Sequence, residues 1–231
     1  MTALLILLFG IHPMTAVGTD LLFAAVTKST GAAVHSGNGN VDWRIVIRLA
    51  TGSVPATVLV LWLLSGGPLH DVTFARSISF AIGIALTLAA VGLLLRRPLQ
   101  DYAQRRSSSQ SSAISTAMTV ALGAMLGCVV TMTSVGAGAF GLAILFFLYP
   151  HCSPVRLVGT DIAHAVPLTF IAGLGHWLIG SVDWSLLVAL LVGSVPGVMV
   201  GSHLAHRVPE RVLLPLLASL LLIIGGRLML G

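Results

Sequence analysis

Two stretches of this 231-residue chain are copies of one another. The tetrapeptide Val-Gly-Thr-Asp at 17–20 recurs at 158–161, which is 141 residues later (158 minus 17). Val-Asp-Trp at 41–43 and Gly-Ser-Val-Pro at 52–55 recur at the same offset, without a gap. Three motifs in one register indicate an internal duplication. Two related halves in an apolar chain are typical of membrane transporters, so the duplication already restricts the folds available.

The apolar composition indicates the solvent in which these halves fold. Hydrophobic residues make up 56% of the chain and charged residues 8%, whereas a soluble domain carries about 25% charged residues. The apolar residues form long runs, which fit membrane helices of about 20 residues each. The short alternating segments of a membrane barrel are not seen. We therefore predict an all-α, polytopic membrane protein.

The charged residues argue against several classes of partner. The net charge is +5, but the basic residues lie mostly singly or in pairs between apolar runs. That distribution is typical of membrane topology signals and not of a surface that binds phosphates, so nucleic acid is not an expected partner. The two cysteines, Cys128 and Cys152, show no metal-ligand spacing. We expect the lipid bilayer as a partner, no metal site and no cofactor.

One polar segment divides the chain. Residues 96–112 hold four arginines and a Ser/Gln tract, which is typical of a solvated linker. We therefore predict a first repeat at 1–95, a polar cytoplasmic linker at 96–112 and a second repeat at 113–231. Asp42-Trp43 and Asp183-Trp184 predict the starts of matching helices, because aspartate caps a helix and tryptophan prefers the membrane interface.

Each predicted repeat contains one apolar run that is too short to cross a membrane. The runs at 2–11 and 140–149 each have about ten residues, or about 15 Å of helix, which is half the apolar core of a bilayer. They occupy matching places in the two repeats. We therefore predict short broken or re-entrant helices there, which in transporters point to the binding site.

The second repeat also has a segment that the first repeat lacks. A helical run at 113–132 and a break at 133–138 precede its short run, and the matching positions of the first repeat would lie before Met1. We therefore expect that the first helix of repeat one is missing. Either the start codon lies upstream or the chain is a natural truncation.

The arginines differ between the copies in a way that indicates orientation. Arg44 matches Ser185, whereas Thr15 matches Arg156, so at each compared loop only one copy is basic. Basic loops prefer the cytoplasm. We therefore predict inverted repeats, with the two halves inserted in opposite senses and the arginine-rich linker in the cytoplasm.

The motifs, taken in order, resemble a known family. The run Pro-x-x-Ala-Val-Gly-Thr-Asp-Leu-Leu-Phe from Pro13, followed by Gly-Asn-Val-Asp-Trp-Arg and Gly-Ser-Val-Pro, is similar to the sulfite exporter TauE/SafE family of bacterial membrane proteins. The second copy, from Val-Gly-Ala-Gly-Ala-Phe-Gly to Gly-Ser-Val-Pro-Gly, resembles the same family. The resemblance implies a multi-pass inner-membrane transporter that exports small sulfur-containing anions such as sulfite or organosulfonates.

A small oxyanion inside a membrane needs hydrogen-bond donors more than fixed charge. Helix N-termini offer unpaired N–H groups, glycines let an anion approach the backbone, and hydroxyls add donors. A Ser-Val-Gly-Ala-Gly break precedes the second short run, and two Gly-Thr pairs lie early in the helices that follow Pro13 and Pro154. The alternative is close helix packing by small residues. The predicted substrate-binding residues are Gly18, Thr19, Gly159, Thr160, Ser134, Gly136, Gly138 and Lys28, the last of which could instead neutralise an acid.

Proton coupling is predicted for acids and histidines that both copies retain. A carboxylate within an apolar run is costly and usually functional, and beside an anion it must be protonated to avoid repulsion. The predicted coupling residues are Asp20, Asp161, His35 and His176. The alternatives are aspartates paired with threonine or a base, and histidines at the membrane interface. His164, one turn beyond Asp161, is left out because Phe23 replaces it in the first copy.

Two other functions remain open at this point. A passive anion channel needs the same donors without alternating access. An intramembrane hydrolase would need a nucleophile with a positioned base, for which Ser134 and His176 are the pair to consider. The chain has no Gly-x-Ser-x-Gly motif, and a duplication argues against one asymmetric pair. We therefore expect no enzyme activity. The oligomeric state cannot be deduced from these features.

Overall fold

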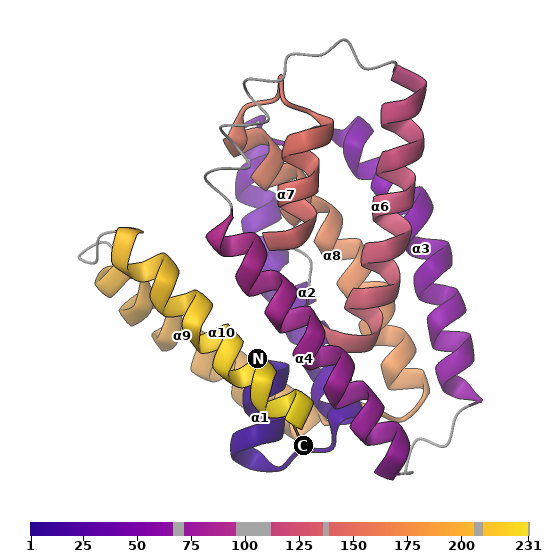
Figure 1. Ribbon diagram of the computed structural model, residues 1–231, viewed down its shortest axis with the longest axis vertical. Helices are drawn as coiled ribbons and strands as arrows, with labels where there is room; N and C mark the ends of the chain where they lie inside the picture. The colour runs from indigo at the N-terminus through magenta and orange to yellow at the C-terminus, as the bar shows by residue number, and fades with distance from the viewer. Residues whose placement is uncertain (67–71, 96–111, 136–138, 206–209, 231) are drawn as a thin grey trace.

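The computed structural model describes the chain apart from residues 67–71, 96–111, 136–138, 206–209 and 231 (Figure 1). All regular secondary structure in the described part is α-helical, as predicted. The helices are α1 (Thr2–Phe9), α2 (Pro13–Gly37), α3 (Trp43–Ser65), α4 (Val72–Leu94), α6 (Ser112–Thr133), α7 (Ala139–Leu148), α8 (Pro154–Leu178), α9 (Trp184–Ala205) and α10 (Glu210–Leu230). The predicted linker lies almost wholly outside the described residues, so the division into domains stays a prediction.

The helices begin where the local sequence favours a start. Pro13 and Pro154 occupy the first turns of α2 and α8, where the fixed φ of proline suits a helix and its missing N–H costs nothing. The Asp42 side chain caps α3 by accepting a backbone N–H two residues on, at 3.1 Å. Asp183 caps α9 by accepting a backbone N–H three residues on, at 3.0 Å. Both predicted Asp-Trp helix starts are therefore confirmed.

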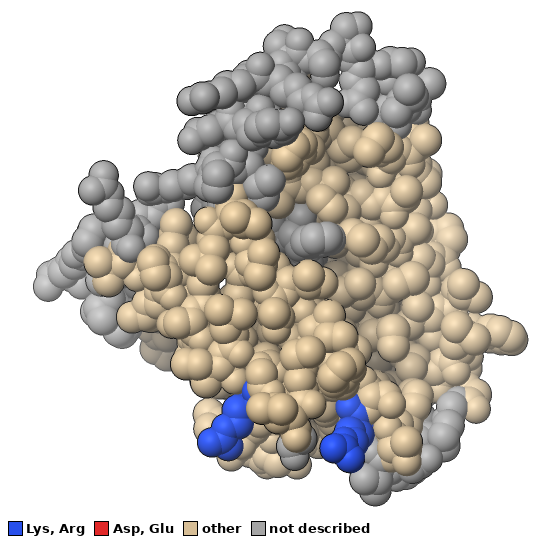
Figure 2. Space-filling model, in the orientation of Figure 1, with Lys and Arg blue, Asp and Glu red and all other residues tan. Residues whose placement is uncertain are grey.

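Several helices have the length and surface of membrane spans. In the described residues, four are long and apolar enough to cross a membrane: Trp43–Ser65, Thr73–Leu94, Thr116–Thr133 and Pro154–Leu178. Many large apolar side chains on the outside are exposed. On the face drawn in Figure 2, the described surface has basic side chains only near its lower end and no acidic ones. Lipid solvates such a surface, whereas water would not.

Small residues bring α3 and α6 into close contact (Figure 1). A Cβ placed on Gly127 of α6 would lie 2.5 Å from the Ser53 carbonyl oxygen of α3. One turn further along both helices, the Thr131 hydroxyl donates to the Thr57 hydroxyl at 3.1 Å. The two helices therefore run parallel, with their backbones held close by glycine, as is common between membrane helices.

The central pair, α2 and α8, runs antiparallel. Gly18 near the start of α2 lies against His176 near the end of α8, and Gly159 near the start of α8 lies against His35 near the end of α2. The two helices begin and end 141 residues apart (154 minus 13 and 178 minus 37). An antiparallel pair is compatible with inverted repeats, but the insertion of the halves in opposite senses stays a prediction.

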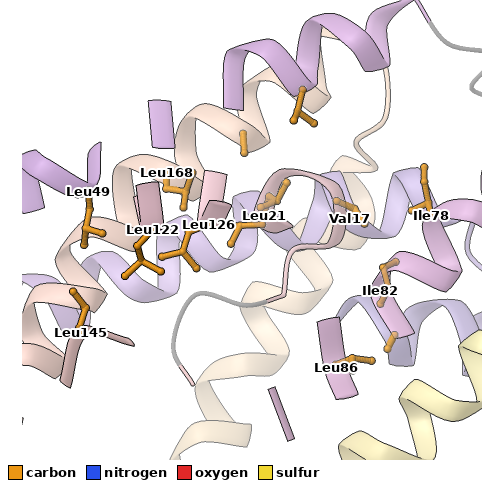
Figure 3. Close-up of a cluster of buried hydrophobic side chains, with 14 of the residues drawn as sticks. Val17, Leu21, Leu49, Ile78, Ile82, Leu86, Leu122, Leu126, Leu145 and Leu168 are labelled. Carbon is orange, nitrogen blue, oxygen red and sulfur yellow. The ribbon is translucent and has the colours of Figure 1, made fainter. Parts of the chain in front are cut away.

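A leucine-rich core fills the space around this pair. Leu21 of α2, Leu126 of α6 and Leu168 of α8 are buried and lie close together in Figure 3. Leu145 of the short helix α7 belongs to the same cluster. The core thus locks the short helix against long helices, and the polar residues described next are enclosed by apolar side chains.

Candidate functional site

Asp20 joins the start of the short helix α1 to the end of α6. The carboxylate is 5% exposed, and its Oδ2 accepts from the Thr2 backbone N–H at 2.9 Å and from the Thr2 hydroxyl at 2.6 Å. The Ser134 hydroxyl donates to the same oxygen at 3.2 Å, and the Met1 amino group lies 3.4 Å from it. A helix start carries unpaired N–H groups and a partial positive charge. Asp20 therefore accepts a hydrogen bond from an N–H group at the start of α1 that has no partner within the helix.

Asp161 lies beside the start of the other short helix, but without a matching bond. The residue is 4% exposed, and its Oδ1 has no hydrogen-bond partner among the described residues. A Cβ placed on Gly141, in the first turn of α7, would lie 3.4 Å from that oxygen. Both half-length helices thus begin next to the aspartate of the long helix that follows, and within the described part of the chain hydrogen bonds join only the first pair.

Ser134 occupies an unusual backbone conformation at the end of α6. Its φ is 56°, in the left-handed region that a residue with a Cβ enters at a cost of roughly 1–2 kcal/mol. Its backbone N–H donates to Val130 at 2.8 Å and closes the helix. Strain of this kind often marks a functional position. Gly136 and Gly138 of the predicted binding loop lie outside the described residues.

The two Gly-Thr pairs contact the opposite half of the chain. The Thr19 hydroxyl accepts from the Asp183 backbone N–H at 3.1 Å, and the Thr160 hydroxyl accepts from the Asp42 backbone N–H at 2.9 Å. A Cβ on Gly18 would overlap the Ser181 carbonyl oxygen, and Gly159 meets Asn40 in the same way. Here these pairs hold the turns that precede α9 and α3. Substrate contact at either pair stays a prediction that requires those turns to move.

Those turns have further polar anchors. Arg156 forms an ion pair with Asp42 at 3.1 Å, which joins the start of α8 to the start of α3. The Ser185 hydroxyl and the Leu186 N–H hold the pKa of Asp183 below its usual value. Burial raises the pKa of the Cys152 thiol, and the Asp42 charge nearby adds to that shift. The turn before α3 is therefore held by an ion pair and the turn before α9 by neutral donors to Asp183.

Lys28 is half-buried on α2, two turns beyond Asp20. It lies close enough to Asp161 and Asp20 to interact electrostatically with both, and Asp161 is the stronger partner. It forms no ion pair with a carboxylate among the described residues. The structure thus places one cation near both predicted coupling acids, and its contact with substrate stays a prediction.

The predicted histidines differ in their surroundings. His176 is fully buried, and its Nε2 donates to the Thr131 carbonyl oxygen at 2.9 Å. Because a carbonyl oxygen only accepts, that bond requires a proton on Nε2, and Nδ1 has no partner among the described residues. His35 is half-buried and packs against Gly159. The bonds of His176 to Thr131 and of Ser134 to Asp20 give no nucleophile–base pair.

The residue that sequence reasoning left out is His164. It is fully buried, and its Nε2 lies 2.9 Å from the Ser53 hydroxyl oxygen of α3. Nδ1 has no partner among the described residues. The available signal was a titratable side chain in an apolar run, one turn from an acid. Comparing the two copies hid that signal, because Phe23 stands at the matching place.

Fold and site together define a multi-pass helical membrane protein in which each of two half-length helices begins beside a buried aspartate, an arrangement typical of membrane transporters. The chain belongs to the sulfite exporter TauE/SafE family, whose model matches residues 1–228. The family resemblance found in the sequence is confirmed, and the chain is a membrane transporter.

Two bacterial relatives carry the same assignment. The chain is 38% identical over 230 residues to the "Probable membrane transporter protein YjnA" of Bacillus subtilis (strain 168), which covers 99% of this chain and 89% of that protein. It is 30% identical over 227 residues to the "Probable membrane transporter protein YdhB" of the same organism, which covers 96% of this chain and 89% of that protein. No solved structure matches the chain.

Proposed function

We propose that this transporter exports small sulfur-containing anions, sulfite or organosulfonate-like, across the inner membrane of a bacterial cell and couples their movement to protons. The family assignment supports the substrate class. The observation that carries the proposal is the position of α1 and α7, which both begin at a buried aspartate. A helix start attracts an anion through its N–H groups and partial positive charge, and the start of α7, unlike that of α1, has no described hydrogen bond to its aspartate.

The substrate site we propose lies around the connection between α6 and α7. Ser134 supplies a hydroxyl, and the backbone at Gly136 and Gly138 supplies N–H groups to sulfonate or sulfite oxygens. Lys28 supplies the balancing positive charge. Gly18-Thr19 and Gly159-Thr160 add donors when the turns that now cover them move away during transport.

The coupling residues we propose are Asp20, Asp161, His35 and His176. An unprotonated aspartate beside the anion repels it, so proton binding and anion binding favour each other. Asp161 supports this role most directly, because its buried Oδ1 is not engaged by any described donor. Coupling of this kind moves the proton and the anion in the same direction, so an imposed proton gradient can drive the anion in that direction against the anion's own gradient. Export from the cell is then driven by a high internal concentration of the anion.

Flux in proteoliposomes tests the function. Purified protein is reconstituted, and uptake of radiolabelled sulfite and of a labelled alkyl sulfonate is measured with and without an imposed pH gradient. We expect saturable uptake that the gradient drives above equilibrium and that Asp161→Asn abolishes. Saturable but never concentrative flux would identify a passive channel instead. Unchanged pH-dependent uptake in the Asp20→Asn, Asp161→Asn double variant would rule out the coupling role of the acids.

A further inference from the structure

Asp161 and His164 present unsatisfied polar atoms on one face of α8. Residues three apart on a helix are neighbours, with Cβ atoms about 5–6 Å from each other. Both side chains are buried, and both Asp161 Oδ1 and His164 Nδ1 have no hydrogen-bond partner among the described residues. Leaving such an atom unpaired inside a protein is unfavourable, because the atom has lost its hydrogen bonds to water. Two such atoms on one face of a helix favour the passage of a proton between the two side chains.

The other nitrogen of the imidazole is already bonded. His164 Nε2 lies 2.9 Å from the Ser53 hydroxyl, which belongs to α3. If the hydroxyl donates, Nδ1 carries the ring proton and suits an ionised Asp161. If Nε2 donates, Nδ1 is a bare acceptor and suits a protonated Asp161. The ring therefore has one arrangement for each charge state of the acid.

We propose that Ser53, His164 and Asp161 form a proton relay that loads Asp161 from the α3 side. The inference rests on the transport function proposed above and assigns its proton path. Ser53 passes its hydroxyl proton to Nε2 and takes a replacement proton from a hydronium ion that enters beside α3, while Nδ1 passes its proton to Asp161 Oδ1. One proton enters and one is held on the carboxyl, and the imidazole ends neutral with its tautomer exchanged. A rotamer change or one bridging water closes the remaining distance.

The charges around this pair connect proton loading to anion binding. Lys28 on α2 interacts electrostatically with Asp161 and with His164, and Asp20 lies on the same helix. Among the described residues next to Asp161 and His164, α3, α6 and α7 supply Ser53, Leu126 and Gly141, none of which titrates. When Asp161 takes up the proton, its carboxyl no longer balances Lys28. The uncovered ammonium then attracts the anion.

The relay differs from the arrangement in the first half. Asp20 is bonded to Thr2 and Ser134, and the position matching His164 is Phe23, which cannot carry a proton. The relay we propose therefore runs through Asp161 alone, while Asp20 also holds α1 in place through its bonds to Thr2.

Two substitutions at His164 separate a relay from a structural role. His164→Gln keeps a polar atom near Nε2 and the contact with Ser53, whereas His164→Asn keeps one near Nδ1. Neither passes a proton across the side chain. Two assays are compared in proteoliposomes: sulfite uptake driven by a pH gradient, and exchange of labelled for unlabelled sulfite at equal pH, which needs no net proton movement. His151→Gln, on the exposed connection between α7 and α8, is the control.

We expect both His164 variants to lose gradient-driven uptake by about a hundredfold, the scale set by removing a positioned acid or base, and to keep exchange. Asp161→Asn should show the same loss of gradient-driven uptake. Combining Asp161→Asn with either His164 substitution should cause no greater loss. A similar fall in gradient-driven uptake and in exchange would overturn the relay. Full gradient-driven uptake by either His164 variant would also overturn it. Absence of sulfite exchange in the parent protein would count against the proposed function, not the relay.

A measurement without sulfite keeps the relay testable if the variants fail to fold. Isotope-labelled histidine in the lipid-embedded parent protein reports the tautomer of each ring by NMR, with signals assigned by comparison with single-histidine variants. We expect the His164 tautomer to exchange as pH crosses the titration of Asp161, while His176 keeps its Nε2 proton. A single His164 tautomer over the whole pH range would refute the proposal.

Discussion

Gly52 and Gly193 occupy matching places in the two Gly-Ser-Val-Pro motifs, so one substitution made at each compares two packing environments. A Cβ added to Gly52 on α3 would overlap the Val120 carbonyl oxygen and lie 2.7 Å from the Ala124 nitrogen. These are backbone atoms of α6, which cannot rotate away. A Cβ added to Gly193 on α9 would meet no atom within 4 Å among the described residues.

The expected cost of Gly52→Ala follows from that overlap. Non-bonded carbon atoms pack at about 3.5–4.0 Å, so α3 and α6 must separate by roughly 1 Å where they touch. Overpacking costs about 1–3 kcal/mol, and the better helix propensity of alanine returns up to about 1 kcal/mol. The net loss should be about 1–2 kcal/mol. Gly193→Ala has only the propensity effect and should be neutral or stabilising by up to about 1 kcal/mol.

Unfolding of the purified protein in mixed micelles, titrated with SDS and followed by circular dichroism, measures both effects. The midpoint should fall for Gly52→Ala and stay unchanged or rise for Gly193→Ala. An equal fall in both variants would mean that another helix covers α9 in the membrane, which contradicts the open surface assigned to it. No fall for Gly52→Ala would contradict the close contact between α3 and α6.

Three further outcomes are expected. Asp20→Asn should lower the free energy of unfolding by about 2 kcal/mol in the same titration, because it weakens charge-assisted bonds to Thr2, whereas Asp161→Asn removes no described bond and should not. Cys152 should react with a maleimide more slowly at neutral pH than an unperturbed thiol, since burial raises its pKa; rates measured against pH would check this. In the folded protein the pKa of Asp183 lies below its ordinary value of 3.8. The stability that Asp183 contributes is therefore complete above pH 3.8 and is lost as the pH falls through the pKa of the folded state. At acid pH the free energy of unfolding of Asp183→Asn should therefore depend less steeply on pH than that of the parent protein.

The elements of the fold were predictable because their signals are local. Proline at 13 and 154 and aspartate at 42 and 183 act within one helical turn, so helix starts could be found without knowing the fold. The short helices followed from counting apolar residues against the thickness of a bilayer. α7 is observed as Ala139–Leu148, close to the predicted run.

The site was only partly predictable because its contacts are far apart in the sequence. Asp20 was singled out as a buried acid, but its bond to Ser134 crosses 114 residues. His164 and Ser53 are separated by 111 residues. A single sequence gives the residue types and their faces, but not which long-range partner satisfies each polar atom. For that reason Asp20 and Asp161 looked equivalent, although only one is satisfied.

Residues that both copies retain can have a structural role as well as a functional one. The Gly-Thr pairs and the Asp-Trp turns are residues through which each half contacts the other. Such contacts must match for two copies to pack together, so duplication preserves them for structural reasons. Chemistry that runs in one direction needs the halves to differ. The copies do differ at His164 and Phe23, and at Lys28 and Thr169, and His164 and Lys28 lie next to the unsatisfied Asp161. The proton path that we propose therefore runs through a position where the two predicted copies differ.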